Sequence, residues 1–263
     1  MTDELLYDKH DGVATITLNR PEKLNAFTTA MLHDWVEALL DAQNDDTIGA
    51  IVLTGKGRGF CSGGDVNGMD ERKQQETPYM RKMSLANRVH CIPLIMESLD
   101  KPVIVAVNGV ATGAGMDMAL MGDIRIAAAS ARFAETYVRV GIMAGDGGAW
   151  YLPRLIGMPR ALELLWTARF VEAEEAERIG LVNQVVPDEQ LMPTVYEMAQ
   201  RIAAGPPLAV RMMKKAAYQG LSIDLRTHLE QVSSHMAVLF STEDHQEALN
   251  AFKEKRQPKF KGR

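Results

Sequence analysis

The sequence predicts an α/β fold in which short buried strands alternate with amphipathic helices and a helical region follows. Residues 102–107 form an unbroken apolar run rich in β-branched side chains, which is the pattern of a fully buried strand. Residues 31–40 instead carry apolar side chains at helical spacing. After residue 144 the pattern becomes mainly helical. With 263 residues, 46% of them apolar, the chain is long enough for one large domain or a domain with an appendage.

The N-terminal elements follow the same pattern. Residues 5–18 are typical of a hairpin around the turn dipeptide Asp11-Gly12. A polar loop follows, and Thr28 or Thr29 is placed to cap the next helix. Residues 50–54 form the next expected strand.

The glycine-rich stretch over residues 55–66 allows three interpretations. As a phosphate-binding loop it fails, because no Lys-Ser or Lys-Thr pair follows its last glycine at the required spacing. As a nucleophile elbow it offers Cys61 between two glycines, but none of the 6 histidines lies in a stretch built for catalysis. As an oxyanion loop, Gly63-Gly64 presents an unpaired backbone N–H after a buried strand. The thiol nucleophile stays as the weaker alternative.

A second loop of small residues lies between the strand at 102–107 and a helix. Gly113, Ala114 and Gly115 lead into good helix formers, so their N–H groups fall where a helix has no internal acceptors. Because no side chain there is larger than a methyl group, a substrate oxygen can approach these donors closely. Taken alone, the three residues are explained by tight packing of a helix on a strand. Together with Gly64, however, two strand ends can converge on one carbonyl oxygen.

Composition narrows the class of protein. The net charge of −5 argues against a nucleic-acid partner, since such proteins usually show a basic face. Cys61 and Cys91 are too few for a disulfide framework or a zinc cage of thiolates, and they suggest a reducing, cytoplasmic compartment. No apolar run approaches the ~18 residues of a membrane span, so no membrane partner is expected.

Five ordered motifs carry a resemblance to a known family. They are N-R-P-E-K-L-N-A at 19–26, G-F-C-S-G-G-D-V at 59–66, K-P-V-I-V-A-V-N-G-V-A-T-G-A-G-M-D at 101–117, D-I-R-I-A from Asp123 and G-L-V-N-Q-V-V-P at 180–187. With these motifs the chain resembles the crotonase superfamily, that is, the enoyl-CoA hydratase/isomerase family, over almost its whole length.

The resemblance implies a crotonase-like spiral of repeated ββα units over residues 1–190, which holds the acyl-CoA site. It also implies a helical region over residues 191–263 that caps the CoA and contacts other copies in a homotrimer or a dimer of trimers. The expected substrate is an acyl-CoA thioester of fatty acid metabolism. Coenzyme A enters as part of that substrate, and no other cofactor and no metal is expected.

The resemblance also assigns binding residues. In the family, the N–H groups at the positions of Gly64 and Ala114 form an oxyanion hole that binds the thioester oxygen and stabilises an enolate. A lysine near Phe252, with Lys23 or Arg20, is expected to pair with the phosphates of CoA. The predicted substrate and CoA contacts are Lys23, Leu24, Ala26, Phe60, Ser62, Asp65, Val66, Gly113, Lys253 and Lys255.

The acid/base residues depart from the hydratase pattern of the family, in which two glutamates are typical. Asp117 stands at the first position and Tyr137 at the second, with Glu135 two residues earlier. Asp117 is also explained as an acid in the first turn of a helix, which favours negative charge. Whether Glu135 reaches the pocket depends on the local conformation.

A further carboxylate, Asp146, lies in the loop that passes over the acyl pocket in the family. The β-diketone hydrolases of the superfamily have a carboxylate there, and the isomerases usually have theirs one residue earlier. An Asp just before two glycines and an apolar helix is also an ordinary N-cap. We predict that Asp146 is the principal acid/base, supported by Asp117 and Tyr137.

The reaction stays open at this point. Hydration and double-bond isomerisation of an enoyl-CoA are the first expectation, and C–C hydrolysis of a β-diketone or β-oxoacyl substrate is the alternative within the superfamily. An inactive assembly subunit is the alternative outside the enzymes.

The remaining segments are expected to be mostly helical. Residues 80–91 are expected to form a helix that ends before Pro93, with His90 in a structural role, and residues 69–77 a surface loop. An apolar run at 181–186 precedes a proline. The expected C-terminal helices span 149–155, 160–167, 172–179, 191–203, 208–219, 225–239 and 243–255.

Overall fold

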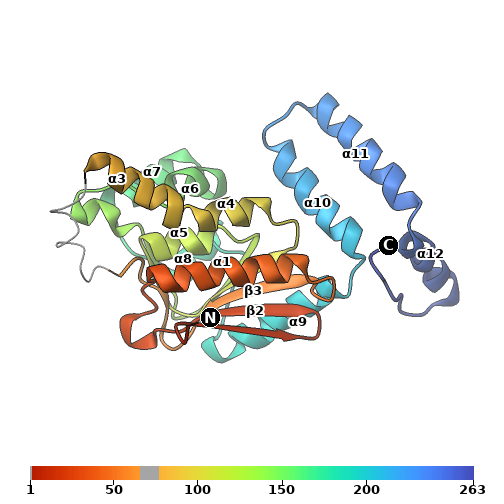
Figure 1. Cartoon of the computed structure of the whole chain (residues 1–263), viewed down its shortest axis with the longest axis horizontal. Helices are drawn as coiled ribbons and strands as arrows, with labels where there is room; N and C mark the ends of the chain where they lie inside the picture. The colour runs from red at the N-terminus through yellow and green to blue at the C-terminus, as the bar shows by residue number, and fades with distance from the viewer. Residues whose placement is uncertain (1, 66–76) are drawn as a thin grey trace.

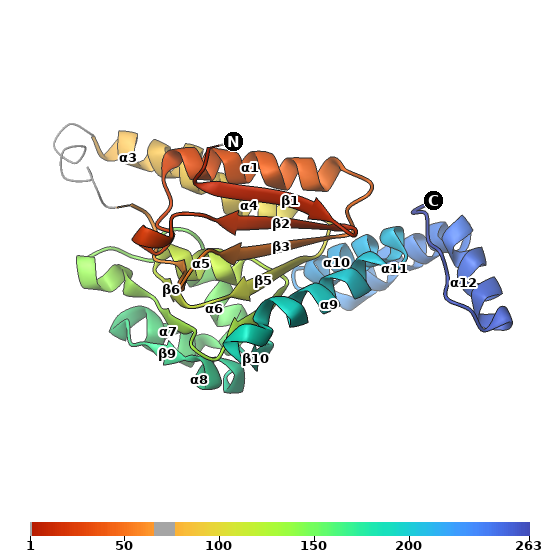
Figure 2. The same cartoon turned by 90° about the horizontal axis from the view of Figure 1, so that it is seen from below.

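A computed structural model describes residues 2–65 and 77–263, and it contains two β-sheets. The larger sheet has the strand order β1-β2-β3-β5-β7-β10, and Figure 2 shows β1, β2, β3 and β5 side by side. The smaller sheet has the order β4-β6-β8-β9. Neighbouring strands are parallel except in the pairs β1–β2 and β8–β9. The strands are β1 (Leu5–His10), β2 (Val13–Leu18), β3 (Ala50–Gly55), β4 (Gly59–Cys61), β5 (Val103–Val107), β6 (Val110–Thr112), β7 (Ile124–Ala128), β8 (Arg132–Ala134), β9 (Val171–Glu172) and β10 (Gln184–Val186).

Three successive strand pairs each contribute one strand to each sheet. β3 is followed by β4, β5 by β6 and then helix α5 (Ala114–Leu120), and β7 by β8. In every pair the first strand joins the larger sheet and the second joins the smaller one. This repeat confirms the predicted crotonase-like spiral.

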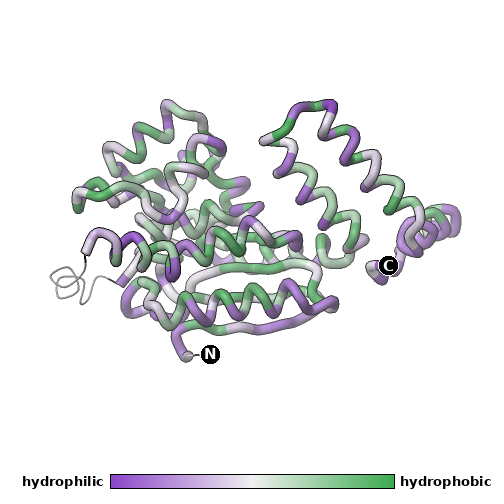
Figure 3. The backbone as a smooth tube through the Cα atoms, turned by 45° about the horizontal axis from the view of Figure 1, so that its top comes forward, coloured by the Kyte–Doolittle hydropathy of each residue, from purple (hydrophilic) through white to green (hydrophobic). Residues whose placement is uncertain are grey.

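The larger sheet is covered on both faces. Successive side chains of a strand point to opposite faces. Ile51 of β3 accordingly joins the core that contains α1 (Thr29–Asn44), while Val52 joins the core built with α9 (Leu191–Ala203). Burial on both sides explains why β3 and β5 are apolar without alternation. Figure 3 shows hydrophobic stretches (green) along these central strands.

The predicted N-terminal elements are confirmed. β1 and β2 form the expected antiparallel hairpin around Asp11-Gly12. Thr28 caps α1, because its hydroxyl oxygen accepts a hydrogen bond from Met31 N at 3.1 Å.

The segment before β5 differs from the prediction. It consists of α3 (Pro78–Ser84), a π-helical turn (Leu85–Val89) and α4 (Cys91–Ser98), so the expected helix end before Pro93 is wrong. Pro93 lies in the first turn of α4, where a missing N–H costs no intrahelical hydrogen bond. The surface loop expected at 69–77 lies almost entirely outside the described residues.

The C-terminal helices are present with nearly the predicted bounds, and the apolar run at 181–186 contains strand β10. They are α6 (Gly148–Ile156), α7 (Met158–Thr167), α8 (Ala173–Arg178), α9, α10 (Pro207–Gly220), α11 (Leu225–Phe240) and α12 (Glu243–Glu254). α9 packs on the larger sheet, and α10 contacts the body through Arg211, Lys214 and Tyr218, whereas α11 and α12 lie farther out (Figure 1). α10 and α11 contain no fully buried residue.

The division of the chain at residue 190 stays a prediction. Among the described residues, no helix combines the length and the hydrophobicity needed to cross a membrane.

Candidate active site

The two loops of small residues lie side by side. β4 and β6 are parallel neighbours in the smaller sheet, so the segments that follow them leave the same edge. A Cβ atom built on Gly63 would lie 3.5 Å from the backbone nitrogen of Ala114. A Cβ atom on Gly115 would lie 2.0 Å from the carbonyl oxygen of Cys61, so only glycine allows α5 to pack this closely on β4. The packing interpretation therefore holds for Gly115, and that packing brings the two loops together.

Where the two loops meet, two backbone N–H groups, those of Gly64 and Ala114, have no hydrogen-bond acceptor among the described residues. Phe27 N donates to Gly63 O at 2.9 Å, and Asp65 N donates to Phe27 O at 3.0 Å. These bonds leave Gly64 N–H without an acceptor among the described residues. Ala114 is the first residue of α5, so its N–H has no partner within the helix.

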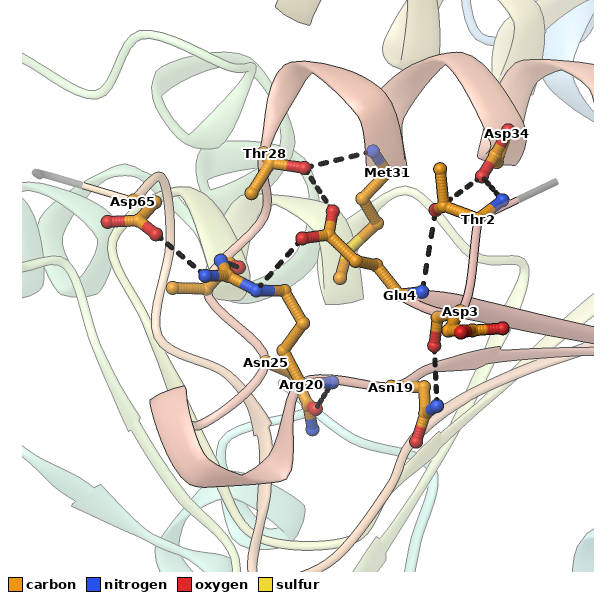
Figure 4. A network of polar contacts seen from close by, with 11 residues as sticks. Thr2, Asp3, Glu4, Asn19, Arg20, Asn25, Thr28, Met31, Asp34 and Asp65 are labelled. Carbon is orange, nitrogen blue, oxygen red and sulfur yellow. Dashed lines mark hydrogen bonds and ion pairs between the residues drawn. The ribbon is translucent and has the colours of Figure 1, made fainter.

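Arg20 holds the glycine loop in place (Figure 4). Its guanidinium lies 2.9 Å from Asp65 and 3.3 Å from Glu4, and it donates to Ala26 O at 2.6 Å. Arg20 thus contacts protein groups, whereas the side chain of Lys23, the other predicted phosphate-binding residue of this loop, is exposed.

The other predicted binding residues fall into different places. Ser62 Oγ donates to Lys23 O at 3.2 Å, and Leu24 has a left-handed backbone, so both belong to the loop around Lys23. Phe60 is fully buried in the main core, so its side chain supports the loop and is not open to a ligand. Val66 lies outside the described residues.

The two predicted phosphate-binding segments lie far apart within one chain. Lys253 and Lys255 are exposed on α12 and just after it. β2 runs away from α12, toward the end of the molecule that carries the loop with Lys23 (Figure 2). A single chain therefore does not bring these cations together.

Cys61 is not a nucleophile, and the nucleophile-elbow alternative is wrong. The side chain is fully buried, and its thiol donates to Asn25 O at 3.2 Å. Burial raises the pKa of the Cys61 thiol to about 12, so no reactive thiolate forms at neutral pH.

The structure brings together all four predicted acid/base residues. Asp117 lies on α5, and Glu135 follows the end of β8. Tyr137 lies in the 3-10 turn Thr136–Val140, and Asp146 lies in the loop before α6. Tyr137 OH lies 2.8 Å from Asp117 Oδ2 and 3.0 Å from Asp146 Oδ2. Asp146 N–H also donates to Asp117 Oδ2, at 3.1 Å.

The Tyr137 hydroxyl carries one proton but faces two carboxyl groups. It donates to one of them, and the second contact is a hydrogen bond only when that carboxyl group is protonated. Burial of the phenol and the neighbouring charges of Asp117 and Asp146 raise the pKa of Tyr137 far above its usual value, so the phenol keeps its proton.

Burial dominates the electrostatics of the carboxyl groups. It raises the pKa of Asp146 to about 6, helped by the charge of Asp117 and opposed by the hydrogen bond from Tyr137 and by His90. It also raises the pKa of Asp117, against the donors that contact this side chain. Asp146 is therefore ionised at neutral pH but able to hold a proton during a reaction.

Asp146 is not a helix cap. The N-cap residue of α6 is Gly147, and no side-chain cap hydrogen bond is formed there. The Asp146 side chain turns instead toward Tyr137, which removes the capping interpretation.

His90 contacts the loop that carries Asp146, a position that no pattern in the sequence indicates. Its ring Nε2 lies 2.8 Å from Gly145 O. A carbonyl oxygen only accepts, so Nε2 carries the proton and the imidazole holds the backbone one residue before Asp146. The π-helical turn that ends at Val89 places His90 there, and π-turns are hard to foresee from a sequence.

The spiral, with its site at the ends of parallel strands, places the chain in the crotonase superfamily. The sequence profile of that superfamily's enoyl-CoA hydratase/isomerase family matches residues 8–263, so the chain belongs to this family. It is an acyl-CoA-processing enzyme of the hydratase/isomerase type.

Individual relatives agree with this assignment. The chain is 41% identical to a short-chain-enoyl-CoA hydratase of Clostridium acetobutylicum, over 97% of this chain and 96% of the relative. It is 38% identical to the 1,2-epoxyphenylacetyl-CoA isomerase of Escherichia coli, over 100% of both. Among solved structures, a putative enoyl-CoA hydratase/isomerase from Mycobacterium abscessus matches with a TM-score of 0.93 and 32% identity, over 98% of this chain and 100% of that one.

Proposed function

We propose that this enzyme isomerises an enoyl-CoA by moving one proton along the acyl chain, with Asp146 as the principal acid/base. The observation that carries the proposal is the position of the Tyr137 hydroxyl, 2.8 Å from Asp117 Oδ2 and 3.0 Å from Asp146 Oδ2. This contact ties Asp146 to a buried proton donor close to the loop of Gly113 and Ala114, because a Cβ atom on Gly113 would lie 4.0 Å from the Tyr137 ring.

The backbone donors supply the other half of the mechanism. The N–H groups of Gly64 and Ala114 bind the thioester oxygen and stabilise the negative charge that develops on it. One such donor contributes roughly 3 kcal/mol to transition-state stabilisation in other enzymes. Their lack of protein acceptors among the described residues supports this role.

The proton step is then balanced within the site. A C–H bond of the acyl chain breaks, its proton goes to Asp146, and its electron pair passes into the dienolate held by the two N–H groups. Asp146 returns the proton at another carbon, and the double bond moves. A carboxyl group with a pKa of about 6 suits both directions, because it is ionised at neutral pH and not too weak as an acid.

Isomerisation is favoured over hydration because the site offers one carboxyl group suited to proton exchange, that of Asp146. Hydration needs a base for the water and an acid for the carbon in the same event. Asp117 is fully buried, and burial and the charge of Asp117 raise the pKa of Glu135 to about 10. Neither residue is placed as the second catalytic carboxylate.

The CoA moiety would be held by two copies of the chain. Lys23 lies on one chain, and Lys253 or Lys255 would come from another copy in a trimer or dimer of trimers. The unburied faces of α10 and α11 support such contacts. We place the activity in cytoplasmic fatty acid metabolism.

The test uses a panel of 2-enoyl-, 3-enoyl- and β-oxoacyl-CoAs in deuterated water, followed by chromatographic separation of the isomers and mass spectrometry. Interconversion of 2- and 3-enoyl-CoA without gain of a water mass is expected. Gain of water would show hydration, loss of an acyl fragment would show C–C cleavage, and no change in any substrate would leave an inactive subunit. Light scattering tests the assembly, and a monomer would contradict it.

A further inference from the structure

Three carboxyl groups are buried together in this site without a cation. Asp117 is 0% exposed, Glu135 1% and Asp146 5%. Within the described residues, no lysine or arginine forms an ion pair with any of them. Unpaired carboxylates in such a place are strongly disfavoured, so the group must hold protons.

The unsatisfied oxygen atoms show where one of these protons is needed. Asp117 Oδ1 and both carboxyl oxygens of Glu135 are buried and form no hydrogen bond of normal geometry among the described residues, although the backbone N–H of Gly148 lies near the Asp117 carboxyl group and lowers its pKa. Asp117 Oδ1 and Glu135 Oε1 also converge on one point, because a Cβ atom built on Gly148 would lie 2.2 Å from the first and 2.8 Å from the second. Two ionised oxygens this close repel each other, whereas one shared proton joins them by a hydrogen bond.

The donors around each group decide which of the two keeps the proton. Asp117 Oδ2 already accepts from Tyr137 OH and from Asp146 N–H. Hydrogen bonds from donors stabilise the ionised form of a carboxyl group. Glu135 has no such donor among the described residues, so the charge belongs on Asp117 and the proton on Glu135.

We propose that Glu135 is a positioning residue that stays protonated and donates its proton to Asp117 Oδ1. Asp117 is then ionised, and its carboxylate accepts hydrogen bonds from the backbone N–H of Asp146 and the hydroxyl of Tyr137, which positions both groups for the reaction. This inference rests on the proposed function, since it assigns the support of the acid/base named there. Glu135 itself does not touch the substrate.

The groups around the pair come from several elements. Tyr137 and Asp146 face Asp117 directly, Tyr151 of α6 lies close enough to interact with it, and His90 faces Asp146 from the start of α4. Burial and the charge of Asp117 raise the pKa of Glu135 to about 10, in agreement with a proton held at neutral pH.

Two substitutions separate a positioning role from simple packing. Glu135→Gln keeps the shape and an N–H donor for Asp117, whereas Glu135→Met keeps the length but removes the donor. We expect kcat of Glu135→Gln to stay within about 3-fold of wild type, and that of Glu135→Met to fall at least ~10-fold with little change in KM. Comparable losses in both variants, or none in Glu135→Met, would overturn the proposal.

The pH profile gives a readout that packing would not move. Without the proton of Glu135, Asp117 takes up a proton itself, and its charge no longer raises the pKa of Asp146. The acid limb of the kcat profile should therefore move to lower pH in Glu135→Met and stay in place in Glu135→Gln. An unmoved limb in a folded, slowed Glu135→Met variant counts against the proposal.

An infrared measurement tests the proton without any activity. At about pH 8 the wild-type protein should show the C=O stretch of a buried protonated carboxylic acid and Glu135→Gln should lack it, whereas Glu135→Met should keep such a band from the proton on Asp117. Absence of this band from the wild type means that Glu135 is ionised and the inference is wrong. If the band is present but no isomerisation is found, the proposed function fails while the proton on Glu135 stands.

Discussion

The two halves of the active site are held in different ways. The donor half consists of backbone N–H groups, fixed by strand pairing and by the contact of Gly115 with Cys61. The acid half consists of side chains from separate elements, joined through Tyr137 and through shared protons. Backbone donors are the same at every pH, whereas the carboxyl cluster changes with each proton it gains or loses. In the proposed mechanism, stabilisation of the enolate is therefore a fixed property of the fold, and proton transfer depends on a cluster whose charges can change.

The largest effect is expected from the donor half. Ala114→Pro removes one N–H, while the first position of a helix tolerates proline. Turnover should fall ~100- to 1000-fold without loss of the folded state, as judged by circular dichroism and the melting temperature. Ala114→Gly keeps the N–H and should remain close to wild type. Normal turnover in a folded Ala114→Pro variant would remove this donor from the mechanism.

A loss of at least ~100-fold is expected when the acid half loses its proton carrier. Asp146→Asn keeps the size and polarity of the side chain beside Tyr137 OH but cannot exchange a proton at neutral pH. The variant should bind acyl-CoA with nearly unchanged affinity, which calorimetry can measure. If Asp146→Asn turns over at the wild-type rate and Asp117→Asn does not, the base is Asp117.

The pH dependence of the two halves should differ as well. Below a pH of about 6, Asp146 is protonated and cannot accept a proton, so kcat/KM should fall with decreasing pH. The same shift affects stability. Folding raises the pKa of Asp146, so the proton on Asp146 stabilises the folded state at low pH, and this stabilisation is lost as the pH rises through about 6. Asp146→Asn should therefore melt at a higher temperature than wild type at pH ~8, with a difference that shrinks toward pH ~4. A constant difference across this range would contradict the raised pKa.

The smallest effect is expected from His90, which supports the acid half from outside. His90→Phe removes the hydrogen bond to Gly145 O and should lower kcat roughly 10-fold by loosening the loop that carries Asp146. His90→Gln offers an amide N–H in its place and should recover most of the rate. Equal rates in the three proteins would show that this contact does not position Asp146.

The sequence was informative where structure is local. The hairpin, α1 with its Thr28 cap and the buried strand β5 follow from turn residues, capping residues and apolar runs within a few positions. The strands β4, β6 and β8 have only three residues each, too few for a periodic signal. They owe their conformation to the neighbouring strands of the smaller sheet.

The acid half shows more clearly which features cannot be predicted from the sequence. Asp146 lies before two glycines and a helix, which is a capping pattern, yet its carboxylate turns to Tyr137. His90 contacts Gly145 across 55 positions of the chain. The proton on Glu135 depends on which oxygen atoms meet at Gly148. Contacts of this kind are set by the packing of whole elements and leave no pattern in the sequence.

The close approach of α5 to β4 also bears on how the site can change during evolution or in a mutant library. Among the described residues, an added methyl group at Gly64 would meet the Phe27 ring at 3.5 Å, an ordinary contact distance. At Gly115 it would overlap the Cys61 carbonyl at 2.0 Å, and relief requires α5 and the loop before it to shift together. A larger residue therefore fits the backbone at Gly64 but not at Gly115. Diversity around this site should accumulate at the carboxyl cluster, while Gly115 stays a position with a single permitted residue.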